Sequence, residues 1–197
     1  MEWIILSDTW VISIYFITTN IFSHLAVRIL WTFDNNLNDF YENYPGNGTN
    51  SPTYSSPGIN GYGSCLYLNA ANKQSITVNS PPFLNMAYTS FSWNGWIKPT
   101  TLHNSIATGF DSALFGQFHQ NTIDYSFYIT IRQQKPYFGF YFDDIQGTTV
   151  LSSGKWYHVC LFRFYFELKS FLLLGCICLW LFTVETVDLY QWSFRCI

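Results

Sequence analysis

Side chains that could act as a general acid or base are few and widely separated. Hydrolysis of a glycosidic bond needs two carboxylates flanking the scissile bond. Residues 31–162 contain one glutamate, Glu42, and one adjacent acidic pair, Asp143-Asp144. Successive residues at a strand end point in different directions, so we expect this pair to be a solvated turn. No GxSxG-like nucleophile motif lies near the histidines of this region, which are His103, His119 and His158. The sequence therefore predicts a protein that is not an enzyme.

The cysteines do not form a metal-binding pattern. No CxxC pair and no histidine at zinc-finger spacing accompanies them; they are Cys65, Cys160, Cys176, Cys178 and Cys196. Cys65 and Cys160 stand apart from the other three. They are either buried thiols that act as small hydrophobic side chains or partners in a disulfide, and the sequence leaves both alternatives open.

A loop-like stretch between Asp39 and Gly63 holds the candidate binding residues. Its composition switches to Asn, Gly, Ser, Pro and Tyr, which is typical of a long surface loop. Its tyrosine rings could stack on sugar faces, anchor a protein partner, or simply cover a sheet edge. These tyrosines are Tyr41, Tyr44, Tyr54 and Tyr62. The same stretch contains an N-glycosylation sequon at Asn47, which fits a secreted chain.

The overall composition fits one extracellular β-domain and excludes nucleic acid as an expected partner. The chain has 197 residues, which is enough for one sizeable domain. Aromatic residues make up 21% of it and charged residues only 11%, so uncharged polar groups must cover much of the surface. The formal charge of −3, with scattered lysines and arginines, provides no basic stripe for a phosphate backbone.

Two apolar segments flank the central region. In residues 1–30, the run Trp10–Ile17 could be the hydrophobic part of a signal peptide or anchor, although no Lys or Arg precedes it. The other interpretations are an additional strand or a segment packed against a partner, and sequence foreign to the native protein. Residues 163–197 contain the uncharged run Phe171–Val184, which is shorter than the roughly 20 residues that span a bilayer. This tail is interpreted as a membrane-associated segment, as divergent final strands or as mistranslated sequence.

The central region, residues 31–162, has short apolar stretches separated by turn residues and no helical pattern, which predicts β-strands. The clearest hairpin pairs Tyr125–Arg132 with Tyr137–Phe142 through the linker Gln133–Pro136. Each of its strands places three large apolar side chains on one face, and each such side chain contributes about 1.5–3 kcal/mol when buried. That face must meet a second sheet.

Four short motifs follow one another along this region. They are WTFD at Trp31–Asp34, GYGSCLYL at Gly61–Leu68, FSWNGWIKP at Phe91–Pro99 and GKWYHV at Gly154–Val159. Alternation along the strands predicts that Trp31 and Phe33 enter the core. In this order the motifs resemble the laminin-G-like jelly roll, a concanavalin A-like sandwich of secreted and cell-surface proteins, over about two thirds of the chain.

The resemblance implies a two-sheet antiparallel jelly-roll sandwich over residues 31–162, secreted or at the cell surface. It implies a non-catalytic recognition or adhesion module that binds a glycan or an extracellular protein. Relatives often hold calcium through aspartates and loop carbonyls, and Asp34 and Asp39 would be the ligands here. The family continues after the WYHV strand with a hairpin and a closing strand. Neither is evident in residues 163–197, so we expect the closing strands to be missing. The alternatives are a membrane-anchored structural protein and a truncated gene model of a larger laminin-G-like protein.

Overall fold

A computed structural model describes residues 2–6, 13–20, 23–79, 90–102, 112–118, 126–140, 143–163 and 177–183. These residues form strands, turns and loops. Helical structure among them is limited to two single 3-10 turns, η1 at Ile59–Gly61 and η2 at Ala70–Asn72. The prediction of an all-β protein is confirmed.

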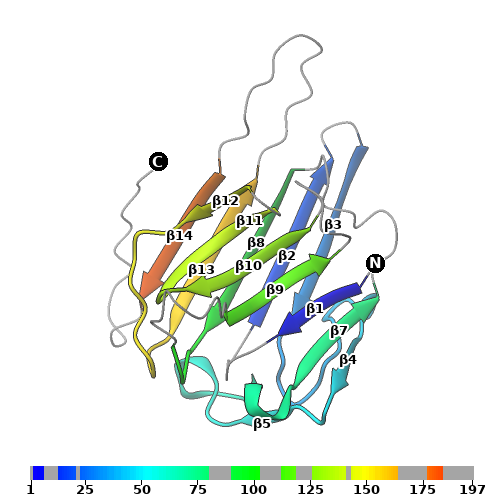
Figure 1. Cartoon of the computed structure of the whole chain (residues 1–197). Helices are drawn as coiled ribbons and strands as arrows, with labels where there is room; N and C mark the ends of the chain where they lie inside the picture. Colours follow the sequence, from blue (N-terminus) through cyan, green and yellow to red (C-terminus); the bar gives the residue numbers. More distant parts are fainter. Residues whose placement is uncertain are drawn as a thin grey trace.

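The strands in the described residues form three sheets, and every pairing among them is antiparallel (Figure 1). The seven-stranded sheet contains, in spatial order, β12 (Asp143–Gln146), β11 (Lys135–Phe140), β10 (Phe127–Arg132), β9 (Ser112–Phe118), β1 (Glu2–Leu6), β7 (Ser75–Asn79) and β4 (Gly46–Thr49). The five-stranded sheet contains β14 (Ile177–Thr183), β13 (Tyr157–Arg163), β8 (Ser90–Ile97), β2 (Ser13–Asn20) and β3 (Ser23–Trp31). The two-stranded sheet contains β5 (Thr53–Ser55) and β6 (Cys65–Tyr67).

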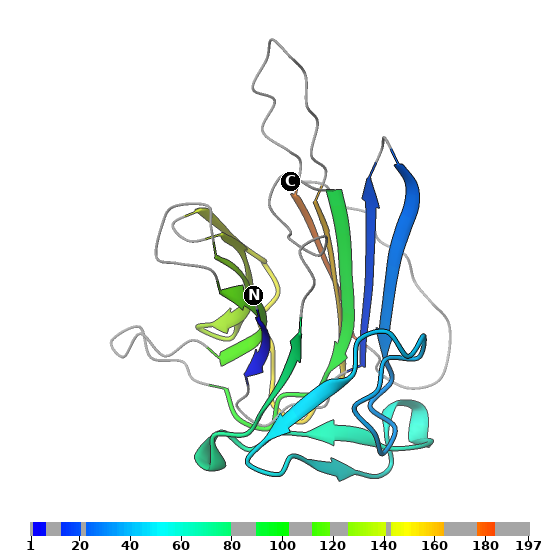
Figure 2. The same ribbon diagram turned by 90° about the vertical axis from the view of Figure 1, so that its right-hand side faces the viewer.

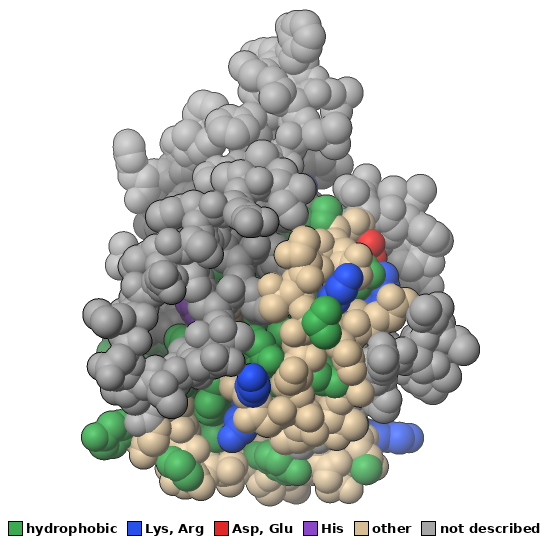
Figure 3. All heavy atoms as spheres, turned by 90° about the vertical axis from the view of Figure 1, so that its left-hand side faces the viewer, with side chains coloured by type: hydrophobic (Ala, Val, Ile, Leu, Met, Phe, Trp, Pro, Cys, Tyr) green, Lys and Arg blue, Asp and Glu red, His purple; other side chains and the backbone are tan. Residues whose placement is uncertain are grey.

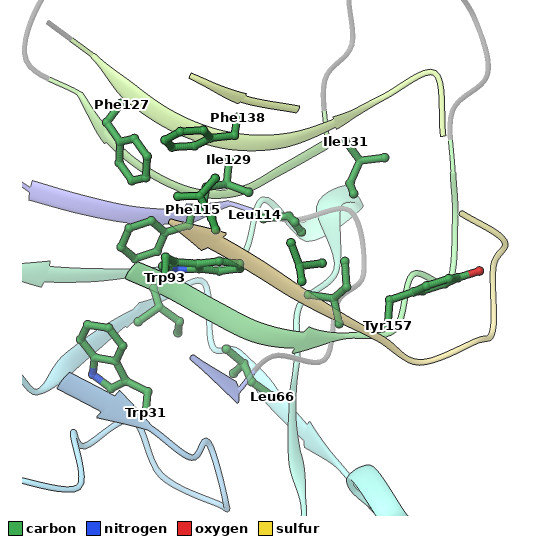
Figure 4. Packing of buried hydrophobic residues seen from close by; sticks show 14 of the residues in the cluster. Trp31, Leu66, Trp93, Leu114, Phe115, Phe127, Ile129, Ile131, Phe138 and Tyr157 are labelled. Carbon is green, nitrogen blue, oxygen red and sulfur yellow. The ribbon is translucent and has the colours of Figure 1, made fainter. Parts of the chain in front are cut away.

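The two large sheets lie on opposite sides of one aromatic core, and the small sheet lies at one end of them (Figure 2). Trp93 on β8 meets Phe115 on β9 with ring centroids 6.0 Å apart, and Phe91 meets Phe127 on β10 at 5.3 Å. Both pairs join one large sheet to the other, and Figure 4 shows the first of them. Burial of these rings therefore helps to hold the two sheets together.

The motif residues supply much of this core, but two details differ from the expected pattern. Trp31 and Phe33 are both buried, as predicted. However, β3 ends at Trp31 and Phe33 adopts a left-handed φ of 55°, so the chain turns there instead of continuing as a strand. At the last motif, β13 begins at the buried Tyr157, and Trp156 precedes the strand half-buried.

The predicted hairpin is confirmed as β10 and β11, with Phe127 opposite Phe140 and Arg132 opposite Lys135. Its connection is shorter than expected. Gln133 and Gln134 alone form the turn, and both have positive φ, at 51° and 61°. Positive φ at both central residues is the requirement of a type I′ turn, whose twist matches that of two paired strands.

The first 30 residues contribute strands to both large sheets instead of lying apart from the domain. β1 pairs with β7 on one side and with β9 on the other. β2 lies between β8 and β3 in the five-stranded sheet. The apolar run Trp10–Ile17 overlaps the start of β2, and a run of this kind is hard to distinguish from a targeting segment by sequence alone.

The tail also contributes a strand, although the sequence showed none. β14 pairs with β13 over its whole length, from Tyr157 opposite Thr183 to Arg163 opposite Ile177. Nearly every residue of β14 is apolar, so no alternation could be read from it. None of the described residues belongs to a helix long and apolar enough to cross a bilayer.

Candidate functional site

The structure divides the four candidate tyrosines into two kinds. Tyr41 and Tyr62 are exposed, with 44% and 84% of their surface accessible. Tyr44 and Tyr54 are half-buried and pack against the core. Burial raises the pKa of both, and the charge of Asp39 raises the pKa of Tyr44 further. Only Tyr41 and Tyr62 therefore present a broad ring surface to a partner.

Phe40 is the exposed aromatic residue that sequence reasoning missed. Its side chain is 68% exposed, and its ring lies edge-on to that of Tyr41, with centroids 5.4 Å apart and an interplanar angle of 89°. A phenylalanine beside a loop is ordinarily assigned to the core, so composition gave no reason to select it. The aromatic pair Phe40–Tyr41 is an apolar surface feature on a loop otherwise rich in polar residues.

Asp39 anchors the loop segment that carries this aromatic pair. It is 1% exposed, and its Oδ1 accepts a hydrogen bond from the backbone N–H of Leu30 at 2.7 Å. Its Oδ2 accepts one from the N–H of Asn43 at 3.3 Å. The backbone N–H of Phe40 donates to the Leu30 carbonyl at 2.7 Å. The loop that carries Phe40 and Tyr41 is thus tied at its base to the end of β3.

Asp34 has a different role on the same loop. Its Oδ1 accepts the backbone N–H of Ser64 at 2.8 Å and so holds the segment that leads into β6. The neighbouring Gly63 has φ +60°, and a Cβ there would lie 3.3 Å from the Asp34 carboxylate. A side chain at this position would strain the contact, which explains the glycine.

Both aspartates that the sequence predicts as calcium ligands accept backbone hydrogen bonds in the structure. Calcium needs six to eight oxygens directed at one point. Both oxygens of Asp39 are directed at backbone N–H groups, and Asp34 is directed at Ser64. Among the residues that the structure describes, no three His, Cys, Asp or Glu side chains form a group that could hold a metal ion. The predicted ligands therefore act as hydrogen-bond acceptors that order the loop.

Asn47 lies on β4, at the edge of the seven-stranded sheet. Asn47, Gly48 and Thr49 are all exposed, so the complete sequon is open to solvent. On its paired side β4 faces β7, where the Thr77 hydroxyl donates to the Asn47 carbonyl at 3.3 Å. A glycan on Asn47 would lie beside the free edge of this sheet.

Cys65 and Cys160 are both buried free thiols. The Cys65 thiol donates to the Ser55 carbonyl at 3.0 Å, within the two-stranded sheet. The Cys160 sulfur lies 3.4 Å from Nδ1 of His158 on β13. Burial raises the pKa of Cys65, and it raises the pKa of Cys160 to about 11. Both cysteines act as small buried side chains and are not bridged to each other.

The acidic pair lies in a strand and not in a turn, because Asp143 and Asp144 begin β12. The Asp144 carboxylate accepts hydrogen bonds from the Tyr128 hydroxyl at 2.7 Å and from Arg132 at 3.1 Å. Burial and the Asp144 carboxylate raise the pKa of Tyr128 well above its usual 10.0. These contacts link β10 to β12 across the sheet face. Of the three histidines noted above, His103 and His119 lie outside the described residues.

A second surface feature is a shallow groove built from three loops, here called the loop groove. It is lined by residues 100–102 after β8, Gln134 in the hairpin turn, and residues 150–153 between β12 and β13, and it encloses about 490 Å³. The Leu151 N–H donates to the Gln134 carbonyl at 2.7 Å, and the Gly154 N–H donates to the Pro99 carbonyl at 2.6 Å. Backbone hydrogen bonds therefore join all three loops.

The face of the molecule drawn in Figure 3 is mostly uncharged where the structure describes it. Figure 3 shows hydrophobic and uncharged polar side chains there, with only separate basic and acidic groups. No protein-family model, no curated protein and no solved structure matches this chain.

Proposed function

We propose that this chain is a non-catalytic recognition module of the secretory pathway or cell surface that binds a carbohydrate or an extracellular protein. The proposed architecture is a jelly-roll sandwich of the laminin-G-like kind. Two observations support it: two large antiparallel sheets face each other across an aromatic core, and Trp31 and Phe33 of the first motif and Trp93 of the third are buried. The exposed sequon at Asn47 supports the extracellular location.

The exposed aromatic pair Phe40–Tyr41 is the observation that carries the proposal. Large aromatic side chains dominate the energetics of recognition surfaces because they bury much area at a low cost in conformational entropy. The hydrogen bonds of Asp39 hold the pair in place before any partner arrives, which reduces the entropy lost on binding. The perpendicular rings offer an edge and a face together, a shape better suited to a protein pocket than to one flat sugar ring.

The test compares binding by the whole chain and by the double variant Phe40→Ala/Tyr41→Ala. Both proteins are presented to a panel of immobilised glycans and of extracellular proteins, and binding is followed by interferometry. The double variant should bind its partner at least about tenfold more weakly, as expected for a hot spot. Its melting temperature should stay close to that of the parent, because both side chains are exposed.

Tyr54→Phe is the matched control, since Tyr54 is half-buried and its ring packs on the core. It should leave binding unchanged. Equal binding by the parent and the double variant would contradict the role of the aromatic pair, and absence of binding across the whole panel would contradict the function.

A further inference from the structure

The loop groove gathers polar side chains that the fold itself does not use. Within the described part of the chain, the hydroxyls of Thr101, Ser152 and Ser153 and the amide of Gln134 have no hydrogen-bond partner. All four groups line the same groove. These hydroxyl and amide groups are therefore available to bind water or a ligand.

The loops that carry these groups are held at defined positions. Leu151 is 1% exposed and fixes the middle of its loop in the core, while the Ser152 N–H donates to the hydroxyl of the buried Tyr157 at 2.8 Å. Gly154, with φ +79°, turns the chain so that its N–H reaches Pro99 at 2.6 Å. A groove fixed in this way loses little entropy on binding a ligand.

The chemistry of the lining selects for an uncharged, hydroxyl-rich ligand. None of the lining residues has an ionisable side chain, so a carboxylate, sulfate or phosphate would lose hydration without meeting an opposite charge. Hydroxyl and amide groups both donate and accept hydrogen bonds, as sugar hydroxyls do. Leu102 and Val150, which is 55% exposed, add apolar surface for the C–H face of a sugar ring. The volume of about 490 Å³ lies within the usual range for small-ligand sites.

The backbone of the groove disfavours an extended peptide. Peptides that add to a protein surface as a strand need free backbone N–H and C=O groups on that surface. The N–H groups of Leu151, Ser152 and Gly154 already donate within the protein, and the Gln134 carbonyl already accepts. The groups that remain are side-chain hydroxyls, one amide and aliphatic carbons.

We propose that the loop groove binds a neutral saccharide, through the hydroxyls of Thr101, Ser152 and Ser153 and the amide of Gln134. This proposal rests on the recognition function argued above but uses a surface other than the Phe40–Tyr41 pair. It assigns the carbohydrate to the groove and leaves the aromatic pair to a second partner.

The experiment uses the full chain and immobilised neutral oligosaccharides of glucose, mannose, galactose and xylose. Sulfated and sialylated oligosaccharides and an unmodified peptide library serve as the comparison probes. Thr101→Val/Ser153→Ala removes two hydroxyls from exposed positions with little change of shape, and we expect about tenfold weaker binding to the neutral sugar. Thr32→Val/Ser55→Ala removes two exposed hydroxyls away from the groove and should bind as the parent does.

Circular dichroism melts on each variant show that a loss of binding is not a loss of folding. Preference for charged glycans or for peptides overturns the proposal, and so does an equal loss in both double variants. Sugar binding that survives Thr101→Val/Ser153→Ala but disappears with Phe40→Ala/Tyr41→Ala overturns the groove as the site and leaves the recognition function standing. The experiment therefore distinguishes failure of the groove as the sugar site from failure of the recognition function.

Discussion

The Asp39 carboxylate and the Leu30 backbone N–H, nine residues apart in the chain, form a buried hydrogen bond of 2.7 Å. Through this contact the end of β3 fixes the loop that exposes Phe40 and Tyr41. The Asp39 carboxylate therefore contributes both to the stability of the fold and to the position of the aromatic pair.

Replacement of Asp39 by alanine should destabilise the fold by about 1–3 kcal/mol, because the buried Leu30 N–H loses its acceptor. The free energy of unfolding in urea measures this effect. Asp34→Ala is the control, and it should cost less because the Asp34 carboxylate is exposed and its hydrogen bond with Ser64 can be replaced by water. Equal losses of unfolding free energy in the two variants would show that burial does not make the hydrogen bond of Asp39 more stabilising than that of Asp34.

Calcium should leave the melting temperature unchanged. The Asp39 oxygens are directed at two backbone N–H groups, so a cation at that carboxylate would displace hydrogen bonds that the fold needs. Differential scanning fluorimetry in calcium and in a chelator makes the comparison. A higher melting temperature in calcium that disappears in Asp34→Ala would show that our interpretation of these aspartates is wrong.

Trp31→Phe should destabilise the protein more than Trp93→Phe, by about 1 kcal/mol. Both side chains are buried, at 2% and 0% exposed, so the apolar loss is similar. The Trp31 indole N–H donates to the Tyr44 carbonyl at 2.8 Å, whereas the Trp93 N–H is buried with no partner in the described structure. Only Trp31→Phe breaks a hydrogen bond. Urea unfolding of the two variants measures the difference, and the opposite order would contradict it.

His158 should make the fold less stable as the pH falls below about 6.5. Burial beneath the stacked ring of Trp96 lowers the pKa of His158 below its usual value of 6.5. The unfolded chain then binds a proton at a higher pH than the folded chain does, so acidification through this range favours unfolding. The free energy of unfolding at pH 7.5 and pH 5.5 should differ less in His158→Gln than in the parent. An identical pH dependence in the two proteins would exclude His158 as its source.

Cys65 and Cys160 should react slowly with iodoacetamide in the folded protein at pH 8 and rapidly in urea. Burial raises both thiol pKa values, so little of the reactive thiolate is present. Peptide mass spectrometry resolves the two sites. The extent of labelling in urea should be the same with and without a reductant. A requirement for reductant would instead reveal a disulfide.

Period-two patterns allowed the central strands to be predicted, because one face of each is apolar and the other is mixed. Phe127, Ile129 and Ile131 alternate with more polar residues, and all three are buried. β14 was not recognised because its sequence is apolar at almost every position. β2 was not recognised because its first half belongs to the apolar run Trp10–Ile17, which resembles a targeting segment. Periodicity carries no signal where both faces are apolar.

Phe40 and the loop groove could not be selected from the sequence for a different reason. The exposure of Phe40 depends on the buried hydrogen bonds of Asp39, a tertiary contact that residue types do not reveal. The loop groove depends on the meeting of segments around residues 100, 134 and 151, which only the folded topology brings together. Tyr41 and Tyr62, which the sequence predicts as ligand contacts, are exposed and lie in a stretch rich in turn residues; their contact with a ligand stays a prediction.

The position of β1 has a consequence for the timing of synthesis. β1 lies between β7 and β9 and pairs with both, but β9 begins only at Ser112. At translation rates of about 5–20 residues per second, β1 leaves the ribosome on the order of ten seconds before its second neighbour exists. Throughout that interval an apolar strand must remain without one of its two neighbours. The seven-stranded sheet therefore closes late, and a chaperone that shields β1 in the nascent chain would raise the yield of folded protein.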